Sequence, residues 1–305
     1  MTDEHFETGP KKLSRRGRGR AKASLTLIER MYAIVEAAQP ITGRGVGYKL
    51  FVAGLIPDMS RKSMAKVYRL LKETREEGII PWDWIVDETR GLERRAAWND
   101  PAHYVNTVSR NYRRDFWNQQ PVRVEIWSEK GTVRGVLAPV LDEHGVGFRA
   151  FHGFDSATEV HDISIDDDGR TLIAIYVGDY DPSGMCMSEV DLPKRLPKYG
   201  ATHVDLRRLT LRREHVRGLP SFPASDKHKD KRYRWFVDNY GKTCWELDAL
   251  DPRDLRRMVE QAIQEQIEWE AWERCRVVQE AEIESLKNVL DTWPTNEKQW
   301  GDPAI

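Results

Sequence analysis

Three acidic residues come directly after predicted strands, where a parallel sheet gathers its ligand-binding side chains. Glu129 follows a strand that ends at Trp127, and Asp179 and Asp181 follow a strand that ends at Val177. Ligands bind beyond the carboxyl ends of parallel strands, so we expect the three carboxylates at one edge of the sheet. The two aspartates are separated by one residue and project to the same side of an extended segment. Such hard oxygen ligands predict a Mg²⁺ site.

The same acids also have structural interpretations. Asp181 precedes Pro182 and could be the N-cap of a helix that begins there. Glu129 could pair with a nearby arginine. Glu125 points to the opposite side of its strand from Ile126, so we expect it to face solvent or a salt bridge and leave it out of the metal site.

The region that carries these acids alternates between strand and helix patterns. Residues 122–127 alternate apolar and polar side chains, whereas residues 172–177 are continuously apolar, as is typical of a strand covered on both faces. Helical periodicity follows each strand. This alternation predicts an α/β fold with a parallel sheet and right-handed crossovers.

The N-terminal third predicts three short helices and an extended segment. Apolar residues recur at helical spacing over residues 25–38, 42–54 and 60–78. Thr42 and Ser60 occupy N-cap positions for the second and third helices. The segment 79–90 is predicted to be an extended pair or wing, and residues 100–120 a connecting helix. This order predicts a winged helix-turn-helix domain, whose third helix would enter the major groove of DNA.

Positive charge is concentrated in the same part of the chain. Residues 1–120 carry 22 Lys and Arg against 15 Asp and Glu, whereas residues 121–305 carry 26 against 34. The cations expected to contact DNA phosphates are Arg15, Arg16, Arg18 and Arg20 in a basic arm and Lys62, Lys66 and Arg69 on the third helix. A solubilising tail and a solvated helix face are the alternatives.

These patterns divide the chain into four parts. They are a flexible basic arm (1–23), a winged-helix domain with its connecting helix (24–120), a parallel-sheet α/β domain (121–250) and a C-terminal helix and tail (251–305). The chain lacks an apolar run of the roughly 20 residues that a membrane span needs, and its three cysteines form no CxxC pair. We expect a cytoplasmic protein associated with the nucleoid and not with a membrane.

Two motifs resemble a known family. Glu129-Lys130-Gly131 and the later Asp179-Tyr180-Asp181-Pro182-Ser183-Gly184 resemble the Toprim domain, which has a glutamate followed by an Asp-x-Asp motif. The likeness is to the A subunit of type IIB topoisomerases (topoisomerase VI) and the related meiotic double-strand-break transesterase. In that family a winged-helix domain precedes Toprim and carries a nucleophilic tyrosine shortly after an arginine. Arg44-Gly45-Val46-Gly47-Tyr48 lies where that motif would fall.

The resemblance implies a DNA-cleaving transesterase. Tyr48 would attack a DNA phosphodiester to give a 5′-phosphotyrosyl intermediate, Arg44 would favour its phenolate or bind the phosphate, and Mg²⁺ would be held by the acidic triad. It also implies a homodimer, with one subunit's tyrosine at the other's metal site, and a separate ATPase (B-type) subunit. The family often has an aromatic residue before its tyrosine and a polar one after its arginine; here those places hold Gly47 and Gly45.

Two alternatives stay open. The protein could be a Toprim nuclease in which metal-activated water attacks the phosphate and Tyr48 is structural. It could also be a non-catalytic DNA-binding protein with a vestigial triad. Tyr32 and Tyr68 are weaker candidates for a nucleophile, because both lie on predicted core stripes.

Overall fold

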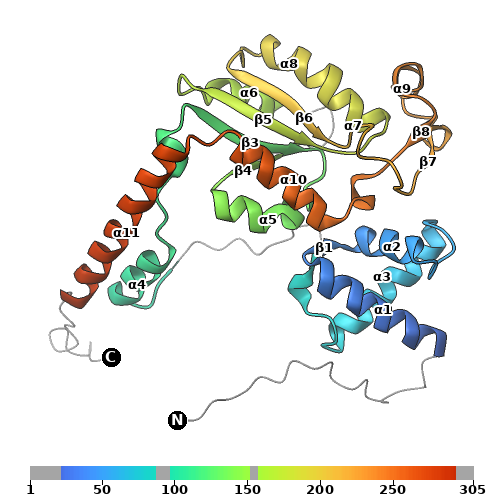
Figure 1. The fold of residues 1–305 in the computed structure, drawn as a ribbon, viewed down its shortest axis with the longest axis horizontal. Coiled ribbons are helices and arrows are strands. Elements are labelled where there is room, and N and C mark those ends of the chain that lie inside the picture. The colour runs from blue at the N-terminus through green and yellow to red at the C-terminus, as the bar shows by residue number, and fades with distance from the viewer. Residues whose placement is uncertain (1–21, 87–96, 152–156, 293–305) are drawn as a thin grey trace, which may run out of the picture. The chain divides into compact units, whose positions relative to one another are not determined.

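The computed structural model describes residues 22–86, 97–151 and 157–292 and divides into two compact units (Figure 1). The first unit comprises Met1–Thr89 and Val124–Ile263, and the second comprises Arg90–Arg123 and Gln264–Ile305. The first unit therefore contains both the predicted DNA-binding helices and the predicted metal-binding sheet. The basic arm with Arg15, Arg16, Arg18 and Arg20 lies outside the described residues.

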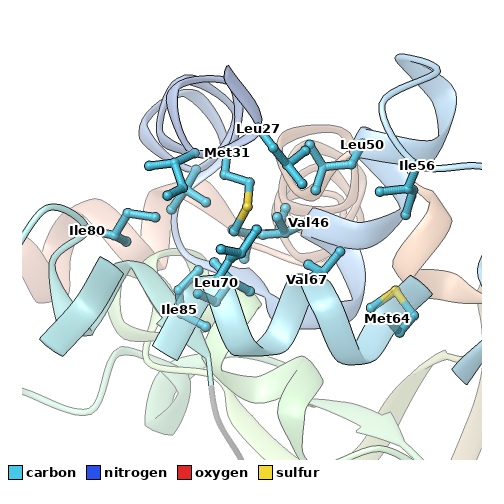
Figure 2. Close-up of a cluster of buried hydrophobic side chains, with 14 of the residues drawn as sticks. Leu27, Met31, Val46, Leu50, Ile56, Met64, Val67, Leu70, Ile80 and Ile85 are labelled. Carbon is cyan, nitrogen blue, oxygen red and sulfur yellow. The ribbon is translucent and has the colours of Figure 1, made fainter. Parts of the chain in front are cut away.

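The three predicted N-terminal helices are present in the first unit. They are α1 (Lys22–Ala38), α2 (Gly43–Val52) and α3 (Arg61–Glu76). Thr42 and Ser60 are the N-caps of α2 and α3, as predicted, and each side-chain oxygen accepts a backbone N–H three residues on. Their apolar stripes meet in one core, which includes Met31, Val46 and Leu70 (Figure 2).

The segment after α3 differs from the predicted extended pair. A 3₁₀ turn (Trp82–Trp84) leads into the two-residue strand β2 (Ile85–Val86), which pairs in parallel with β1 (Ile41–Thr42). Residues 79–86 therefore form no hairpin. Tyr68 is not in the core either: it is 46% exposed, and its ring lies against Gly43 of α2.

A four-stranded parallel sheet forms the rest of the first unit, in the order β4-β3-β5-β6. Its strands are β3 (Val122–Ser128), β4 (Gly147–Ala150), β5 (Thr171–Val177) and β6 (Val204–Thr210). The helices around it are α5 (Thr132–His144), α6 (Ala157–Ile165), α7 (Pro182–Cys186), α8 (Leu192–Lys198) and α10 (Pro252–Gln264). The parallel α/β prediction is thus confirmed, and the buried strand β5 is interior as expected.

Side chains from α6 and α8 cover one face of the sheet, and α5 and α10 lie toward the other (Figure 1). A π-helical turn at Met187–Asp191 joins α7 to α8. Beyond β6, β7 (Phe222–Pro223) pairs in antiparallel fashion with β8 (Thr243–Cys244), and α9 (Tyr233–Tyr240) lies between them in sequence. No described helix combines the length and the apolar character that crossing a bilayer requires.

The second unit is helical. The connecting helix predicted over 100–120 ends early, because α4 covers Pro101–Asn111 and a separate 3₁₀ turn covers Phe116–Gln119. The single C-terminal helix predicted within residues 251–305 is also two helices, α10 and α11 (Trp269–Thr292). Phe116 and Trp117 pack their rings against Trp272 of α11.

Candidate functional site

The three predicted metal ligands lie at the carboxyl edge of neighbouring strands. Glu129 directly follows β3, Asp179 and Asp181 directly follow β5, and β3 and β5 are adjacent in the sheet. Asp179 is 3% and Asp181 1% exposed. We call Glu129, Asp179 and Asp181 the acidic cluster.

The members of the acidic cluster act on one another. Burial and, after it, the negative charges of Asp179 and Asp181 raise the pKa of Glu129 to about 7, against the opposing effects of Lys130 and Ser183. The Ser183 hydroxyl donates to Glu129 Oε2 at 3.1 Å. Asp181 is also the N-cap of α7, as its alternative interpretation predicted, and accepts the Gly184 N–H at 2.8 Å.

Two lysines neutralise the aspartates. Lys130 Nζ lies 2.8 Å from Asp179 Oδ2 and 3.3 Å from Asp248 Oδ2, while Lys227 Nζ lies 2.9 Å from Asp181 Oδ2. Burial alone lowers the pKa of the Lys130 ammonium, but Asp179 and Asp248 outweigh it, so that pKa lies above its usual range. Positive charge therefore already sits against the carboxylates that a cation would approach.

The carboxylates of the acidic cluster are the right kind of ligand for a hard cation, but their spacing suits such a cation less well. Three crowded carboxylates provide the oxygen ligands and the negative charge that Mg²⁺ prefers. Their ligand atoms do not all lie within 4.8 Å of one another. In the described part of the chain, that spacing is met by Glu143, His144 and Glu260. Cation binding at the acidic cluster would require Lys130 and Lys227 to give way.

A buried arginine fixes the loop that carries the two aspartates. Arg208 on β6 donates to the carbonyls of Gly178, Asp179, Gly184 and Leu211 and to the Ser188 hydroxyl, at 2.5 to 3.1 Å. A Cβ at Gly184 would lie 2.4 Å from the Asp179 carbonyl oxygen, so the close turn depends on glycine there.

Arg44 and Tyr48 lie on one side of α2, as their four-residue spacing predicts. Arg44 makes a bidentate ion pair with Glu246, through Nε to Oε2 and through Nη2 to Oε1, the latter at 2.6 Å. Its guanidinium carbon is 5.8 Å from the centroid of the Tyr48 ring. Burial and, after it, the Glu246 carboxylate raise the pKa of the Tyr48 phenol well above its usual range, against the opposing effect of Arg44.

The segment 246–251 joins α2 to the acidic cluster. Glu246 binds Arg44, Asp248 accepts the Thr42 hydroxyl at 2.5 Å, and Asp251 accepts the Lys49 ammonium at 2.8 Å. The Leu247 N–H donates to Asp179 Oδ1 at 2.8 Å, and Lys130 bridges Asp179 and Asp248. The tyrosine helix and the acidic cluster are therefore linked within the first unit.

The two glycines that depart from the family pattern are explained by packing. A Cβ at Gly47 would lie 2.4 Å from Met64 Sδ on α3, and one at Gly45 would lie 2.9 Å from Ile41 Cγ1. A polar or aromatic side chain at these positions would therefore require Ile41 or Met64 to move.

The predicted cationic stripe forms an exposed face of α3. Lys62, Lys66 and Arg69 are all exposed, and Arg69 lies 3.8 Å from Glu73 on the same helix. Glu125 pairs with Arg149, in agreement with its predicted place outside the metal site.

Sequence reasoning missed several residues of the site. Lys130 is directly next to a predicted ligand, so its position was a usable signal. Glu246 and Asp248 have no predicted role in the site. Lys227 and Arg208 carry no local pattern that distinguishes them from other surface cations.

No protein-family model matches this chain, and neither a curated protein nor a solved structure matches it.

Proposed function

We propose that this protein is a metal-dependent DNA-cleaving transesterase of the topoisomerase VI A-subunit kind, with a winged-helix-like N-terminal part and a Toprim-like sheet. One observation carries the proposal. The helix that bears Arg44 and Tyr48 is tied, through Glu246 and Asp248, to the loop that bears Asp179. Residues of the types needed for nucleophile, cation and metal ligand therefore meet in one compact unit.

In this proposal Glu129, Asp179 and Asp181 hold Mg²⁺, which when bound neutralises charge on the phosphoryl oxygens. Arg208 keeps the aspartate loop in place through its contacts with the carbonyls of that loop. When the cation displaces Lys130 and Lys227 from the aspartates, the two lysines can bind DNA phosphates. When the cation leaves, they pair with the aspartates again.

Tyr48 forms the new bond. Its phenol oxygen loses a proton and attacks phosphorus, the bond from phosphorus to the 3′ oxygen breaks, and the 3′ oxygen takes up a proton. Tyr48 is 4% exposed and its pKa is raised, so attack requires that the phenol be uncovered and deprotonated. Arg44 is the nearby cation. Once its ion pair with Glu246 is broken, Arg44 would stabilise the phenolate of Tyr48.

The proposed substrate is double-stranded DNA, contacted by the exposed face of α3 that carries Lys62, Lys66 and Arg69. A homodimer and a separate ATPase subunit are parts of the same proposal, carried over from the family resemblance.

A Toprim nuclease is the second candidate. It is favoured by the burial of Tyr48 and the raised pKa of its phenol, which are typical of a structural tyrosine. In that case water attacks the phosphate and no protein stays attached to the DNA.

The two candidates are separated by cleavage of supercoiled plasmid with Mg²⁺, quenched with detergent and analysed on a denaturing gel with and without protease. For a transesterase, we expect cut DNA that enters the gel only after protease, and Tyr48→Phe should abolish it. Tyr68→Phe is the matched control, since Tyr68 also lies near Arg44 but is half exposed.

Cut DNA that is free of protein and survives Tyr48→Phe decides against the transesterase and identifies the nuclease. An absence of cutting, with DNA binding that Asp179→Asn with Asp181→Asn leaves unchanged, is the result expected of the non-catalytic DNA-binding protein. Cutting that begins only when an ATPase partner is added keeps the transesterase.

A further inference from the structure

A basic groove lies beside the acidic cluster. It has a volume of about 600 Å³ and lies between the α7–α8 region and residues 229–232. Lys194 contributes from α8, Lys229 and Lys231 contribute from the loop before α9, and Cys186 lies at the end of α7. We call this feature the lysine groove.

The charge of the lysine groove is unbalanced. Its two acids are already paired with arginines: Asp191 lies 2.5 Å from Arg195, and Asp230 lies 2.6 Å from Arg232. The three lysines that remain are exposed, and the described residues give none of them an acidic partner. Three positive charges therefore face the groove without compensation.

Two segments of the chain connect the groove with the acidic cluster. Lys227, which contacts Asp181, is joined to the groove by a hydrogen bond from the Asp230 N–H to its carbonyl at 2.9 Å. Asp181 caps α7, the five-residue helix that ends at Cys186. The groove thus begins within a few residues of the predicted metal ligands.

We propose that the lysine groove binds the phosphodiester backbone of the DNA segment adjoining the bond to be cut. This inference rests on the proposed function and adds the path of the substrate. Lysines act as point charges for phosphates and carry no base preference, so the contact would be independent of sequence. Cations placed here draw the DNA toward carboxylates that would otherwise repel it.

The test is the salt dependence of duplex binding without metal, in EDTA, measured by fluorescence anisotropy between about 50 and 200 mM salt. The variant Lys194→Gln, Lys229→Gln, Lys231→Gln removes the three charges. Each phosphate contact contributes about −0.9 to the slope of log K against log salt. We therefore expect the slope to become less steep by about 2.7 and the affinity to decrease about 10-fold or more.

The control variant removes three exposed cations elsewhere: Arg257→Gln, Arg274→Gln and Arg276→Gln. Each of these is paired with an acid on its own helix. The control should keep the wild-type slope. Equal weakening by both variants, an unchanged slope in the groove variant, a wild-type protein that does not bind duplex DNA, or a preference for an RNA duplex would each overturn the inference.

Cys186 provides a second readout that does not depend on the stability of a variant. The other two cysteines are buried, whereas Cys186 is partly exposed. A duplex with a thiol-reactive tether on one phosphate should cross-link to the wild-type protein and not to Cys186→Ser. Absence of this cross-link in a protein that binds the duplex counts against the groove.

Failure of this inference is distinguishable from failure of the proposed function. If the protein forms the protease-sensitive adduct but binds DNA equally well without the three lysines, the proposed function stands and the proposed role of the groove is wrong. If binding depends on the three lysines but no adduct forms, the proposed role of the groove stands and the proposed transesterase activity is wrong.

Discussion

Arg208 holds the aspartate loop through hydrogen bonds to backbone carbonyls. Burial lowers the pKa of its guanidinium, yet four carbonyls and one hydroxyl accept its protons. Lysine cannot reproduce this planar fork. We expect Arg208→Lys to destabilise the protein by roughly 3 kcal/mol or more in urea unfolding, since hydrogen bonds to charged groups contribute about 1.5–3 kcal/mol each.

The neighbouring Arg207 provides the control for that measurement. It lies on the same strand, is exposed, and pairs with Asp205 at 2.6 Å. Arg207→Lys should change the free energy of unfolding by less than about 0.5 kcal/mol. Equal effects of the two substitutions would contradict the role given to Arg208.

At the scale of elements, α10 is fastened to α1 by one side chain. Arg256 donates to the carbonyls of Ala38, Gln39 and Pro40 at the end of α1, and to the Val136 carbonyl of α5. The last carbonyls of a helix lack partners within it, so an arginine there satisfies them.

We therefore expect Arg256→Met to lower the free energy of unfolding by about 1.5–3 kcal/mol. The exposed Arg257 is bound only to Asp254, and Arg257→Met should cost less than about 0.5 kcal/mol. Thermal or urea unfolding of both variants measures the difference, and a near-zero cost for Arg256→Met would show that α10 is held by its apolar face alone.

The ion pair between Lys49 of α2 and Asp251, just before α10, makes the stability of the protein depend on pH. Burial alone raises the pKa of Asp251, but hydrogen bonds from Arg253 and Lys49 hold that pKa well below its usual range. A lowered pKa in the folded state means stability that is present above the unfolded pKa of about 3.9 and is lost as the pH falls below it.

Asp251→Asn should therefore destabilise the protein at pH 7, and the difference from wild type should shrink below about pH 4. Urea unfolding across that range measures it. Asp254→Asn, at an exposed position on the same helix, is the control. A gap between wild type and Asp251→Asn that stays constant down to acid pH would contradict the pairing.

Most elements could be predicted from the sequence because their signals are local. The caps at Thr42 and Ser60 and the apolar run of β5 needed no tertiary information. The strand β6 was not predicted, because a buried strand is recognised by its apolar side chains and this one carries Arg208. Hydrogen bonds to backbone carbonyls allow Arg208 to be buried there. The break between α10 and α11 was missed because a distant side chain shapes it: Gln120 accepts the Glu268 N–H at 2.7 Å.

The site was predictable to the same degree. The sheet edge that collects the acidic cluster follows from the predicted parallel sheet, because the carboxyl ends of its strands lie at one edge. The contacts of Lys227 and Glu246 span tens to hundreds of residues, and no periodicity encodes them.

At the scale of the whole molecule, the two units differ in how they are held together. The first unit has two large apolar cores, whereas in the second unit α11 packs Trp272 against the rings of Phe116 and Trp117 in the 3₁₀ turn after α4. Between Arg276 and Asn288 no side chain of α11 is fully buried. Local opening costs little where few apolar contacts are lost.

We expect the amides of α4 and of α11 after Cys275 to exchange with deuterium well before those of β3 and β5. Hydrogen exchange followed by mass spectrometry resolves these segments. Equal protection of α11 and β5 would show that the second unit opens only with the rest of the chain.

The glycines of α2 have a consequence for the motion of Tyr48. Gly43, Gly45 and Gly47 occupy three of the ten positions of this helix, and each disfavours helix by about 1 kcal/mol relative to alanine. The sequence alone therefore favours the unwound chain, and neighbours outside α2 maintain its helical state. Release of residues 246–251 would permit a helix-to-coil transition, and Tyr48 would pass from a packed interior to a flexible loop that can follow its target.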